Sequence, residues 1–205
     1  MSKYRGPRLR IVRRLGSLPG FTRKLSKRNT LPGQAGLVSN NKFSKFFVRL
    51  KEKQKLRFNY GITERQLLNY VKKSRKKRGS SGRLLLTFLE MRLDNIVFRL
   101  GWAPTVFAAR QLINHRHILV NKNIVSIPSF ICSPGSIITV RPIISSKKLV
   151  ERNLMLFNSE TLLIPQHLFL FKENLEAKVN NFVNRKSISL VINELLVIEY
   201  YSRKL

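Results

Sequence analysis

Residues 84–127 read LLLTFLEMRLDNIVFRLGWAPTVFAARQLINHRHILVNKNIVSI, and this stretch decides the fold that we expect. Its first part, residues 84–100, has apolar side chains at the spacing of one helix face, which predicts a helix. Gly101 is the expected end of that helix, because glycine readily adopts the positive φ angles that close helix C-termini. The apolar face consists of Leu89, Leu93, Ile96, Val97 and Leu100. A narrow polar stripe on the same helix consists of Arg92, Asn95 and Arg99.

A second helix is predicted over residues 106–114, with Thr105 as its N-cap residue. At about 100° per residue, one side of this helix is apolar and the other polar. The apolar side consists of Val106, Ala109, Leu112 and Ile113. The polar side consists of Arg110, Gln111, Asn114 and His115. Phe107 falls among the polar residues; we prefer packing on a neighbouring loop for it, with stacking on a nucleic-acid base as the alternative.

A hairpin and a further strand follow the two helices. Residues 118–120 and 124–127 are β-branched runs joined by residues 121–123, Asn-Lys-Asn, which predicts a hairpin. Residues 133–136, Ser-Pro-Gly-Ser, predict a turn before a strand over residues 137–141. The order helix, helix, hairpin, strand predicts an α+β protein with a compact module of this kind at its centre.

The charge balance indicates a polyanionic partner. Forty Lys and Arg against ten Asp and Glu give a formal net charge of +30. Such a chain repels itself, and binding to phosphates relieves this repulsion while releasing condensed counterions. No apolar run approaches the ~18–20 residues that a membrane-spanning helix needs, and no long amphipathic helix with a basic face is visible. RNA and DNA remain as the partners that composition allows.

The positive charge is concentrated in the first three quarters of the chain. Residues 1–60 carry 17 basic and 1 acidic side chains, whereas residues 151–205 carry 7 and 6. Gly and Pro alternate with basic residues over residues 1–43, and we expect a basic extension there that takes its shape on the nucleic acid. Three further parts are expected: a helical N-terminal domain over residues 44–90, the helix–helix–hairpin module over residues 91–150, and a C-terminal helix and strand segment over residues 151–205 that packs back on the body.

The clearest helix start in the N-terminal half lies at Thr63. Thr63 and Gln66 have the spacing of a capping box. The helix is expected to run toward Lys77 and to stop by Gly79. Cations are favourable at a helix C-terminus, which accounts for part of the basic run in its last turns, and we interpret the remainder as contact with a polyanion. The run consists of Lys72, Lys73, Arg75, Lys76, Lys77 and Arg78.

The sequence gives no sign of catalytic or metal chemistry. Cys132 is the only cysteine, so a disulfide within the chain is impossible and a zinc cluster would need all three scattered histidines. His115 and His117 lie two apart without a third or fourth ligand nearby, so we interpret them as satisfied or RNA-contacting histidines. Phosphate-binding glycine loops and a His-Glu-x-x-His motif are missing, and Asp94 is the only acid in residues 91–150. We expect no enzyme activity, no cofactor, no metal and no small-molecule substrate.

Three groups of residues resemble one known family, the small-subunit ribosomal protein four family. The first group resembles an RNA-binding module of the alpha-L type, which this family shares with some RNA-modifying enzymes: residues 90–101 (EMRLDNIVFRLG), 109–115 (ARQLINH) and 118–121 (ILVN). The second resembles the N-terminal part of the family: residues 4–8 (YRGPR), 13–16 (RRLG), 52–61 (EKQKLRFNYG) and 64–68 (ERQLL). The third resembles its C-terminus: residues 192–194 (INE) and 197–203 (VIEYYSR). The resemblance is greatest to plastid members.

The resemblance implies a structural protein of the small ribosomal subunit that binds the rRNA early in assembly, at a multi-helix junction in the subunit body. It also implies neighbouring ribosomal proteins as partners, among them ribosomal protein five, with which it acts in decoding accuracy. Arg and Lys would bind phosphates, and Asn, Gln and His would fix the position on the folded RNA. The residues expected to bind RNA in the N-terminal half are Arg5, Arg8, Arg13, Arg14, Arg57, Arg65, Lys72, Lys73 and Arg83. Those in the module are Arg92, Asn95, Arg99, Arg110, Gln111, Asn114, His115, Arg116, His117, Asn121 and Lys122.

Two residues depart from the family pattern at turns. Arg116 and Lys122 stand where the family commonly has glycine. Glycine there would permit positive φ, so the turns are either reshaped or strained by about 1 kcal/mol per residue. Both replacements add a cation near the expected RNA surface. Residues 151–186 match the family poorly, and we expect their apolar side chains to pack the body or to meet a neighbour.

Two other classes of protein are alternatives. An RNA-modifying enzyme with this module would need a separate catalytic domain, for which a full-length resemblance leaves no room. A DNA-compacting protein would show no preference for ribosomal RNA. Because the family-like start falls at residue 3, we expect no presequence and place the chain in the chloroplast, on the ribosome of the plastid stroma, with the bacterial cytoplasm as the alternative.

Overall fold

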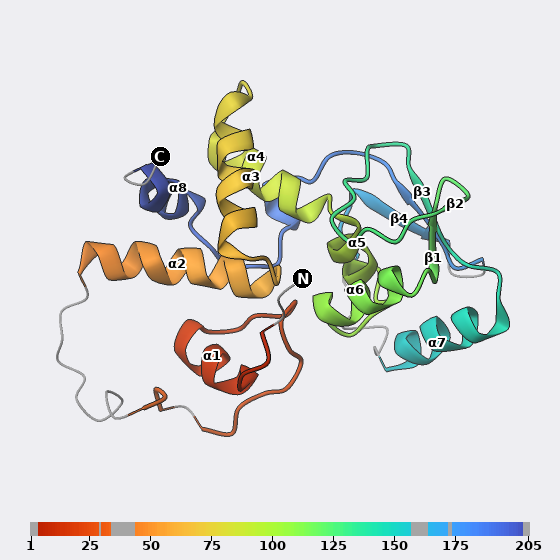
Figure 1. The fold of residues 1–205 in the computed structure, drawn as a ribbon, viewed down its shortest axis with the longest axis horizontal. Coiled ribbons are helices and arrows are strands. Elements are labelled where there is room, and N and C mark those ends of the chain that lie inside the picture. The colour runs from red at the N-terminus through yellow and green to blue at the C-terminus, as the bar shows by residue number, and fades with distance from the viewer. Residues whose placement is uncertain (1–3, 29, 34–43, 157–163, 172–173, 203–205) are drawn as a thin grey trace. The chain divides into compact units, whose positions relative to one another are not determined.

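The computed structural model describes residues 4–28, 30–33, 44–156, 164–171 and 174–202 (Figure 1). The chain separates into two compact units, Met1–Leu86 with Leu190–Leu205, and Thr87–Ser189. The first unit is helical and the second combines helices with a sheet, so the predicted α+β class is confirmed. Among the described helices, none has the length and apolar character that crossing a bilayer requires.

Two capped helices form the centre of the first unit. Helix α2 (Lys45–Asn59) begins after Ser44, whose side chain accepts a hydrogen bond from the backbone N–H of Phe47. Helix α3 (Glu64–Lys76) begins with the predicted capping box, in which both reciprocal bonds between Thr63 and Gln66 form. Lys77 is its C-cap residue, so the predicted end of this helix is confirmed as well.

The C-terminal helix α8 (Glu194–Ser202) completes this unit by packing alongside α2. Glu199 of α8 binds the Nε of Arg49 at 2.7 Å, and the Tyr201 hydroxyl donates to Glu64 Oε1 of α3 at 2.7 Å. Just before α8, the backbone N–H of Asn193 donates to a carboxylate of α2 at 3.0 Å. The end of the chain is therefore fixed to the helices near its beginning.

The N-terminal residues are more ordered than the sequence predicted. Residues 4–28 contain helix α1 (Arg8–Leu15), and the Leu15, Leu18 and Phe21 side chains that follow are buried. The backbone N–H of Gly20 donates to the Asn59 side chain of α2 at 3.0 Å. A few apolar residues thus anchor part of the expected basic extension on α2. Residues 34–43 of the expected extension lie outside the described residues.

In the second unit, the helix predicted over residues 84–100 is interrupted. It consists of α4 (Ser81–Glu90), which begins in the first unit, and α5 (Leu93–Arg99), with Arg92 in an extended conformation between them. Arg92 forms an isolated antiparallel bridge with Ile131, and the backbone N–H of Cys132 donates to the Met91 carbonyl at 2.9 Å. A segment about 40 positions further on thus pairs with the chain at the break. The single polar stripe predicted on this helix does not exist.

The second helix of the module forms as predicted. Helix α6 spans Val106–Asn114, and the Thr105 side chain accepts a hydrogen bond from the backbone N–H of Ala108. Gly101, at φ 76°, follows the end of α5 as expected. The apolar positions predicted for α5 and α6 are all buried, and the two helices pack against each other (Figure 1).

A five-stranded antiparallel sheet is the other half of this unit. Its order is β2-β1-β3-β5-β4. The strands are β1 (Ile118–Val120), β2 (Asn123–Ile124), β3 (Ile137–Val140), β4 (Leu168–Phe171) and β5 (Glu176–Val179). Val120 pairs with Asn123, so the predicted hairpin is confirmed but its turn has two residues rather than three. The last two strands lie in the C-terminal segment, for which strand structure was expected without bounds.

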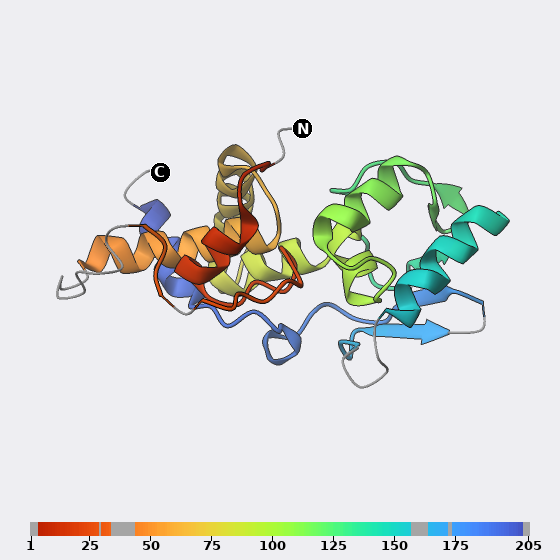
Figure 2. The same cartoon turned by 90° about the horizontal axis from the view of Figure 1, so that it is seen from below.

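One further helix, α7 (Ile144–Met155), packs against β3 (Figure 2). The core of the unit joins α5, α6, the sheet and α7 in one apolar cluster, which includes Trp102, Ile113, Ile138 and Val150. A short 3₁₀ helix, Arg185–Ser187, follows the sheet. Of the apolar residues expected to pack the body after residue 151, Leu168 is buried, Phe169 is half exposed and Leu162 lies outside the described residues.

A network of buried charges ties the break between α4 and α5 to α6. Asp94 accepts from Arg92 Nη2 at 2.7 Å and Nε at 3.0 Å, and from Arg110 Nε at 2.8 Å. The Asp94 side chain is 1% exposed, and those of Arg92 and Arg110 are 2% and 9% exposed. A second buried carboxylate, Glu90, accepts from Arg99 Nη2 at 2.9 Å and from Asn95 Nδ2 at 2.6 Å. Buried charges persist in a fold only when they are paired in this way.

The substitution Asp94→Asn should destabilise the protein strongly, because it leaves two buried guanidiniums facing a neutral amide. Removing one partner of a buried ion pair typically costs about 3–5 kcal/mol. Urea unfolding at neutral pH measures the loss. Glu151→Gln, which removes an exposed carboxylate from α7, is the matched control and should change stability by less than about 0.5 kcal/mol. Equal effects of the two substitutions would contradict the account.

A buried histidine makes the same unit sensitive to acid. His167 is 4% exposed, and neither ring nitrogen has a hydrogen-bond partner among the described residues. Burial lowers the pKa of His167, and the charge on Arg99 acts in the same direction against an opposing effect of Glu90. The folded protein therefore resists a proton that the unfolded chain accepts.

Stability should fall as the pH drops below about 6.5, the ordinary pKa of histidine in an unfolded chain. The free energy of unfolding falls by at most about 1.4 kcal/mol per pH unit because of this residue. The fall continues until the pH reaches the lower pKa of His167 in the folded state. In His167→Phe this contribution disappears, so urea unfolding between pH 7.5 and pH 5 should show a shallower pH dependence than in the wild type. An unchanged slope in the variant would show that His167 is not responsible.

Candidate RNA-binding surface

The C-terminal end of α6 is closed by a left-handed turn that exposes a cation. The backbone N–H of Arg116 donates to the Ile113 carbonyl at 2.9 Å, and that of His117 donates to the Leu112 carbonyl at 3.1 Å. This pair of bonds is a Schellman motif, in which Arg116 adopts φ 63°. Gly61 closes α2 with the same bonds at φ 58°. Arg116 therefore adopts the left-handed conformation that glycine usually takes in this motif, and its side chain is exposed.

The hairpin turn also places exposed side chains on residues with positive φ. Asn121 and Lys122 have φ of 50° and 67°, which is the pattern of a type I′ turn. The Asn121 side chain accepts from the backbone N–H of Ile137 at 2.9 Å, so it fastens the turn to β3. Lys122 is exposed. The sequence left open whether the turns at Arg116 and Lys122 are reshaped or strained. In the structure both residues keep a positive φ, so both turns are strained.

Six of the predicted residues in the second unit are exposed, and they lie at the two ends of β1. They are Gln111, Asn114, His115, Arg116, Asn121 and Lys122. We call these six residues the β1 surface. His117 is half-buried beside them. The five residues from His117 to Asn121 span about 13 Å in an extended strand, so both ends of β1 are within reach of one RNA.

Three other predicted residues of this unit are buried. Arg92 and Arg110 are occupied by Asp94, and Asn95 by Glu90. Arg99 is half-buried against Glu90 as well. The structure therefore gives these four side chains internal partners, and it separates them from the exposed β1 surface. The Arg110 guanidinium also lies 5.8 Å from the centre of the half-buried Phe107 ring on the same helix.

The predicted residues of the first unit differ in exposure. Arg5, Arg14, Arg65, Lys72, Lys73 and Arg83 are exposed. Arg65, Lys72 and Lys73 project from one side of α3, because positions i, i+7 and i+8 share a helix face. Arg8, Arg13 and Arg57 are half-buried and have partners: Arg13 Nη2 donates to the Thr30 carbonyl at 2.7 Å, and Arg57 lies 4.6 Å from the Phe58 ring centre.

Among the exposed cations of the second unit that were not predicted are three on α7: Lys147, Lys148 and Arg152. They lie at the edge of the segment that resembles the family poorly, so the resemblance did not single them out. The only sequence signal was their helical spacing, with Lys148 and Arg152 four residues apart. The fold brings this helix to His117, whose Nδ1 lies 2.9 Å from Ser146 Oγ.

Two histidines lie beside each other near the start of β1. The His115 and His117 ring centres lie 6.1 Å apart. Burial lowers the pKa of His117, and the neighbouring His115 and Arg141 lower it further. Within the described part of the chain, no three His, Cys, Asp or Glu side chains are grouped so that they could hold a metal ion.

A helix–helix–hairpin unit with cations, amides and imidazoles on its exposed turns has the features of a nucleic-acid-binding module. Comparison with known proteins defines it further. The S4 domain family matches residues 91–138, and the family described as ribosomal protein S4/S9 N-terminal domain matches residues 3–90.

Relatives match along the whole chain. Small ribosomal subunit protein uS4c of Euglena gracilis is 64% identical over 206 residues, and small ribosomal subunit protein uS4 of Thermosynechococcus vestitus is 58% identical over 204 residues. In both comparisons the match covers 100% of each chain. The protein uS4c of Oltmannsiellopsis viridis is 57% identical over 99% of this chain and 100% of its own. The chain belongs to the small ribosomal subunit protein uS4 family.

Replacing Arg116 separates the effect of backbone strain from that of charge. Arg116→Gly relieves the positive φ and should raise stability by about 1 kcal/mol, whereas Arg116→Ala keeps the strain and should not. Both variants remove one cation, so both should bind RNA more weakly, to the same extent. Thermal unfolding and filter binding to an rRNA transcript measure the two effects. A stability gain in Arg116→Ala equal to that in Arg116→Gly would contradict the strain at this turn.

Proposed function

We propose that this chain is a structural constituent of the small ribosomal subunit that binds the small-subunit rRNA directly. The observation that carries the proposal is the match to ribosomal relatives along the whole chain. The β1 surface supports it, since cations and hydrogen-bonding side chains are exposed there together. The role is structural rather than enzymatic.

Charged and uncharged side chains on the exposed surface have different roles in binding. Lys and Arg of α3 and of the β1 surface bind backbone phosphates and set the affinity, while Gln111, Asn114 and His115 hydrogen-bond to the folded RNA and fix the position. The buried residues Arg92, Asn95 and Arg110 act indirectly, by holding α5 and α6 in place. Of the residues predicted to bind RNA, we therefore retain as contacts all except the three buried ones, Arg92, Asn95 and Arg110.

The family resemblance supports a finer proposal. The chain binds at a multi-helix junction in the body of the subunit, early in assembly, and it contributes to decoding accuracy next to ribosomal protein five. The plastid relatives favour the ribosome of the chloroplast stroma as its location, with the bacterial cytoplasm as the alternative, since cyanobacterial relatives are nearly as similar. Sedimentation with the small subunits of plastid ribosomes tests this placement.

The two alternative functions have less support. The family matches span residues 3–138 and the relatives match end to end, so no segment remains unmatched that would supply the catalytic domain of an RNA-modifying enzyme. A DNA-compacting protein would need no amide and imidazole side chains at the turns beside its cations, because phosphate contacts alone supply sequence-independent binding.

The purified protein should bind a small-subunit rRNA transcript more tightly than duplex DNA of equal length at the same salt concentration. The affinity should fall with salt with a logarithmic slope of about 0.7–0.9 per phosphate contacted. Replacing Arg116 and Lys122 together by Gln should lower this slope by about 1.4–1.8. Filter binding between 100 and 400 mM salt measures both quantities.

A control with equal loss of charge shows whether position matters. Lys178→Gln with Lys186→Gln removes two exposed cations from the nearly neutral C-terminal quarter of the chain and should leave the slope unchanged. Equal slopes for the two double variants would show that only net charge is sensed. Equal affinity of the wild type for rRNA and for duplex DNA would contradict the proposed function.

A further inference from the structure

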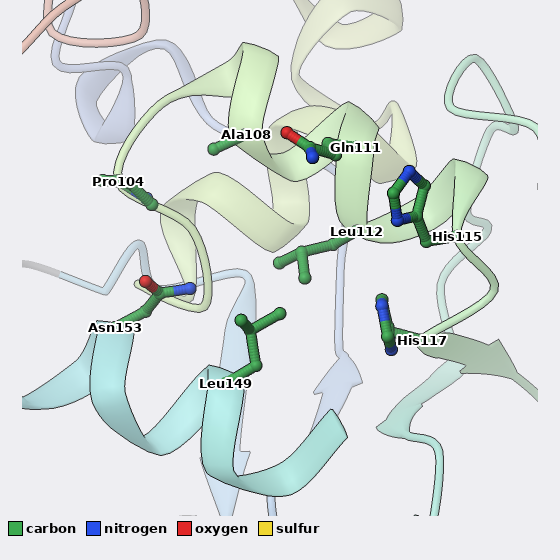
Figure 3. A pocket seen from close by; sticks show the side chains of 8 residues that line it. All are labelled: Pro104, Ala108, Gln111, Leu112, His115, His117, Leu149 and Asn153. Carbon is green, nitrogen blue, oxygen red and sulfur yellow. The ribbon is translucent and has the colours of Figure 1, made fainter. Parts of the chain in front are cut away.

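A cavity of about 310 Å³ lies in the second unit between α6 and α7 (Figure 3). Small-ligand sites have volumes of about 300–1,000 Å³, so this cavity is of a size for a single flat ring system rather than for an extended ligand. Side chains of α6, of α7 and of the turn that leads into β1 line it. No step in the proposed function uses it.

The cavity is apolar in its centre and polar at its rim. Leu112 of α6 and Leu149 of α7 face each other across its middle. Asn153 lies at one end of the cavity and the two histidines at the other, with Gln111 at the upper rim between Ala108 and His115 (Figure 3). Asn153 Nδ2 donates to the Trp102 carbonyl at 2.8 Å, which orients the amide and leaves its Oδ1 as an acceptor. An apolar slot with amides at its edge has the properties of a site for a molecule with flat faces and a hydrogen-bonding edge.

The lining argues against a phosphate as the occupant. Of the side chains around the cavity, none belongs to Lys or Arg. A phosphate placed between Leu112 and Leu149 would lose its hydration without gaining a cation, which is costly. A nucleobase has two flat faces that stack on apolar and imidazole groups, and an edge with both donors and acceptors, which an amide can pair with.

We propose that this cavity receives one unpaired nucleobase, turned out of the RNA that the chain binds; the proposal rests on the function proposed above. Leu112, Leu149 and the imidazole of His117 contact the faces of the base. Gln111 and Asn153 hydrogen-bond to its edge. The chain thus holds its RNA by a base at this point, in addition to phosphates.

The cations around the cavity favour RNA over a protein side chain as the source of the occupant. Arg116 is exposed between the two histidines of the lining, and Arg152 is exposed next to Asn153. At about 100° per residue, Arg152 lies about 60° around α7 from Leu149, whereas Glu151 lies on the opposite side of the helix. The backbone phosphates on either side of an inserted base would therefore meet positive charge.

The state of His117 fits contact with a neutral base. Burial lowers the pKa of His117, and His115 and Arg141 contribute in the same direction, which favours the uncharged ring. Its Nδ1 is engaged with Ser146 Oγ at 2.9 Å, which fixes the plane of the ring. A neutral imidazole held in one orientation offers a flat face for stacking.

Chemical probing of the rRNA transcript with and without the full-length protein tests the proposal. Dimethyl sulfate and a carbodiimide modify the exposed edges of unpaired bases. We expect one unpaired nucleotide to be protected by the wild type and to regain reactivity with Ala108→Leu, which fills the cavity, or with Gln111→Ala, which removes an edge partner. Ala108→Ser, which leaves the cavity open, should protect the base as the wild type does.

An abasic transcript then shows whether the base itself contributes to affinity. Removing the protected base should weaken binding of the wild type by about five- to 150-fold, the range for one stacked base. The same abasic site should hardly change the affinity of the Ala108→Leu protein, because its filled cavity does not accept the base. Melting temperatures of the variants show whether they are folded, and Gln111→Ala, at an exposed position, does not depend on refilling the core.

The other outcomes overturn the proposal in distinguishable ways. If the wild type binds rRNA but no base reactivity depends on the cavity variants, the cavity is not a base site and the proposed function stands. If the variants lower the salt slope and protect every base as before, the occupant is a phosphate. If they bind rRNA normally but lose a neighbouring ribosomal protein from reconstituted subunits, the occupant is a protein side chain. If the wild type does not bind rRNA, the proposed function itself fails.

Discussion

Asp94 accepts hydrogen bonds from two buried guanidiniums, those of Arg92 and Arg110, and this arrangement constrains the rest of the second unit. Arg92 supplies its charge only from an extended backbone, so the helix that would otherwise run through residue 92 is divided into α4 and α5. Arg110 is in α6, so the same carboxylate fixes how α5 and α6 pack. Because buried charges are costly unless they are paired, packings of these helices that separate the three charges are disfavoured. The direction of α6 determines where its C-terminal turn lies.

That turn and the hairpin turn are the places where the scaffold becomes a binding surface. Arg116 and Lys122 both occupy left-handed conformations that glycine adopts without strain. Each position therefore carries a backbone cost of about 1 kcal/mol, and each gains an exposed cation in a chain whose proposed partner is RNA. The strain persists because the Schellman bonds of α6 and the bond from Ile137 to Asn121 hold both turns. The surrounding fold stabilises the turns before any RNA is bound, so the cations are already positioned for binding.

Local signals in the sequence predicted most of this architecture. The capping box at Thr63, the cap at Thr105, the hairpin and the apolar faces of α5 and α6 all depend on residues within a few positions of one another, and all were found in the structure. The break at Arg92 depends on Ile131, about 40 residues away, and periodicity cannot show it. Arg110 was assigned to the exposed polar side of its helix, but the carboxylate of Asp94, which lies on another helix, holds it inside. Strands β4 and β5 are short, and the pairing of β5 with β3, which joins them to the sheet, is also distant in sequence.

The central claim is that the buried charges hold the β1 surface in its binding conformation and that RNA then binds there. Hydrogen–deuterium exchange of the full chain, free and with saturating small-subunit rRNA, tests both parts. The amides of Arg116 and His117, which are bonded to α6 carbonyls, should exchange slowly in the free protein. RNA should slow exchange further at residues 114–123 and leave β4 unchanged. Rapid exchange at these two amides in the free protein, or no effect of bound RNA on residues 114–123, would contradict the account.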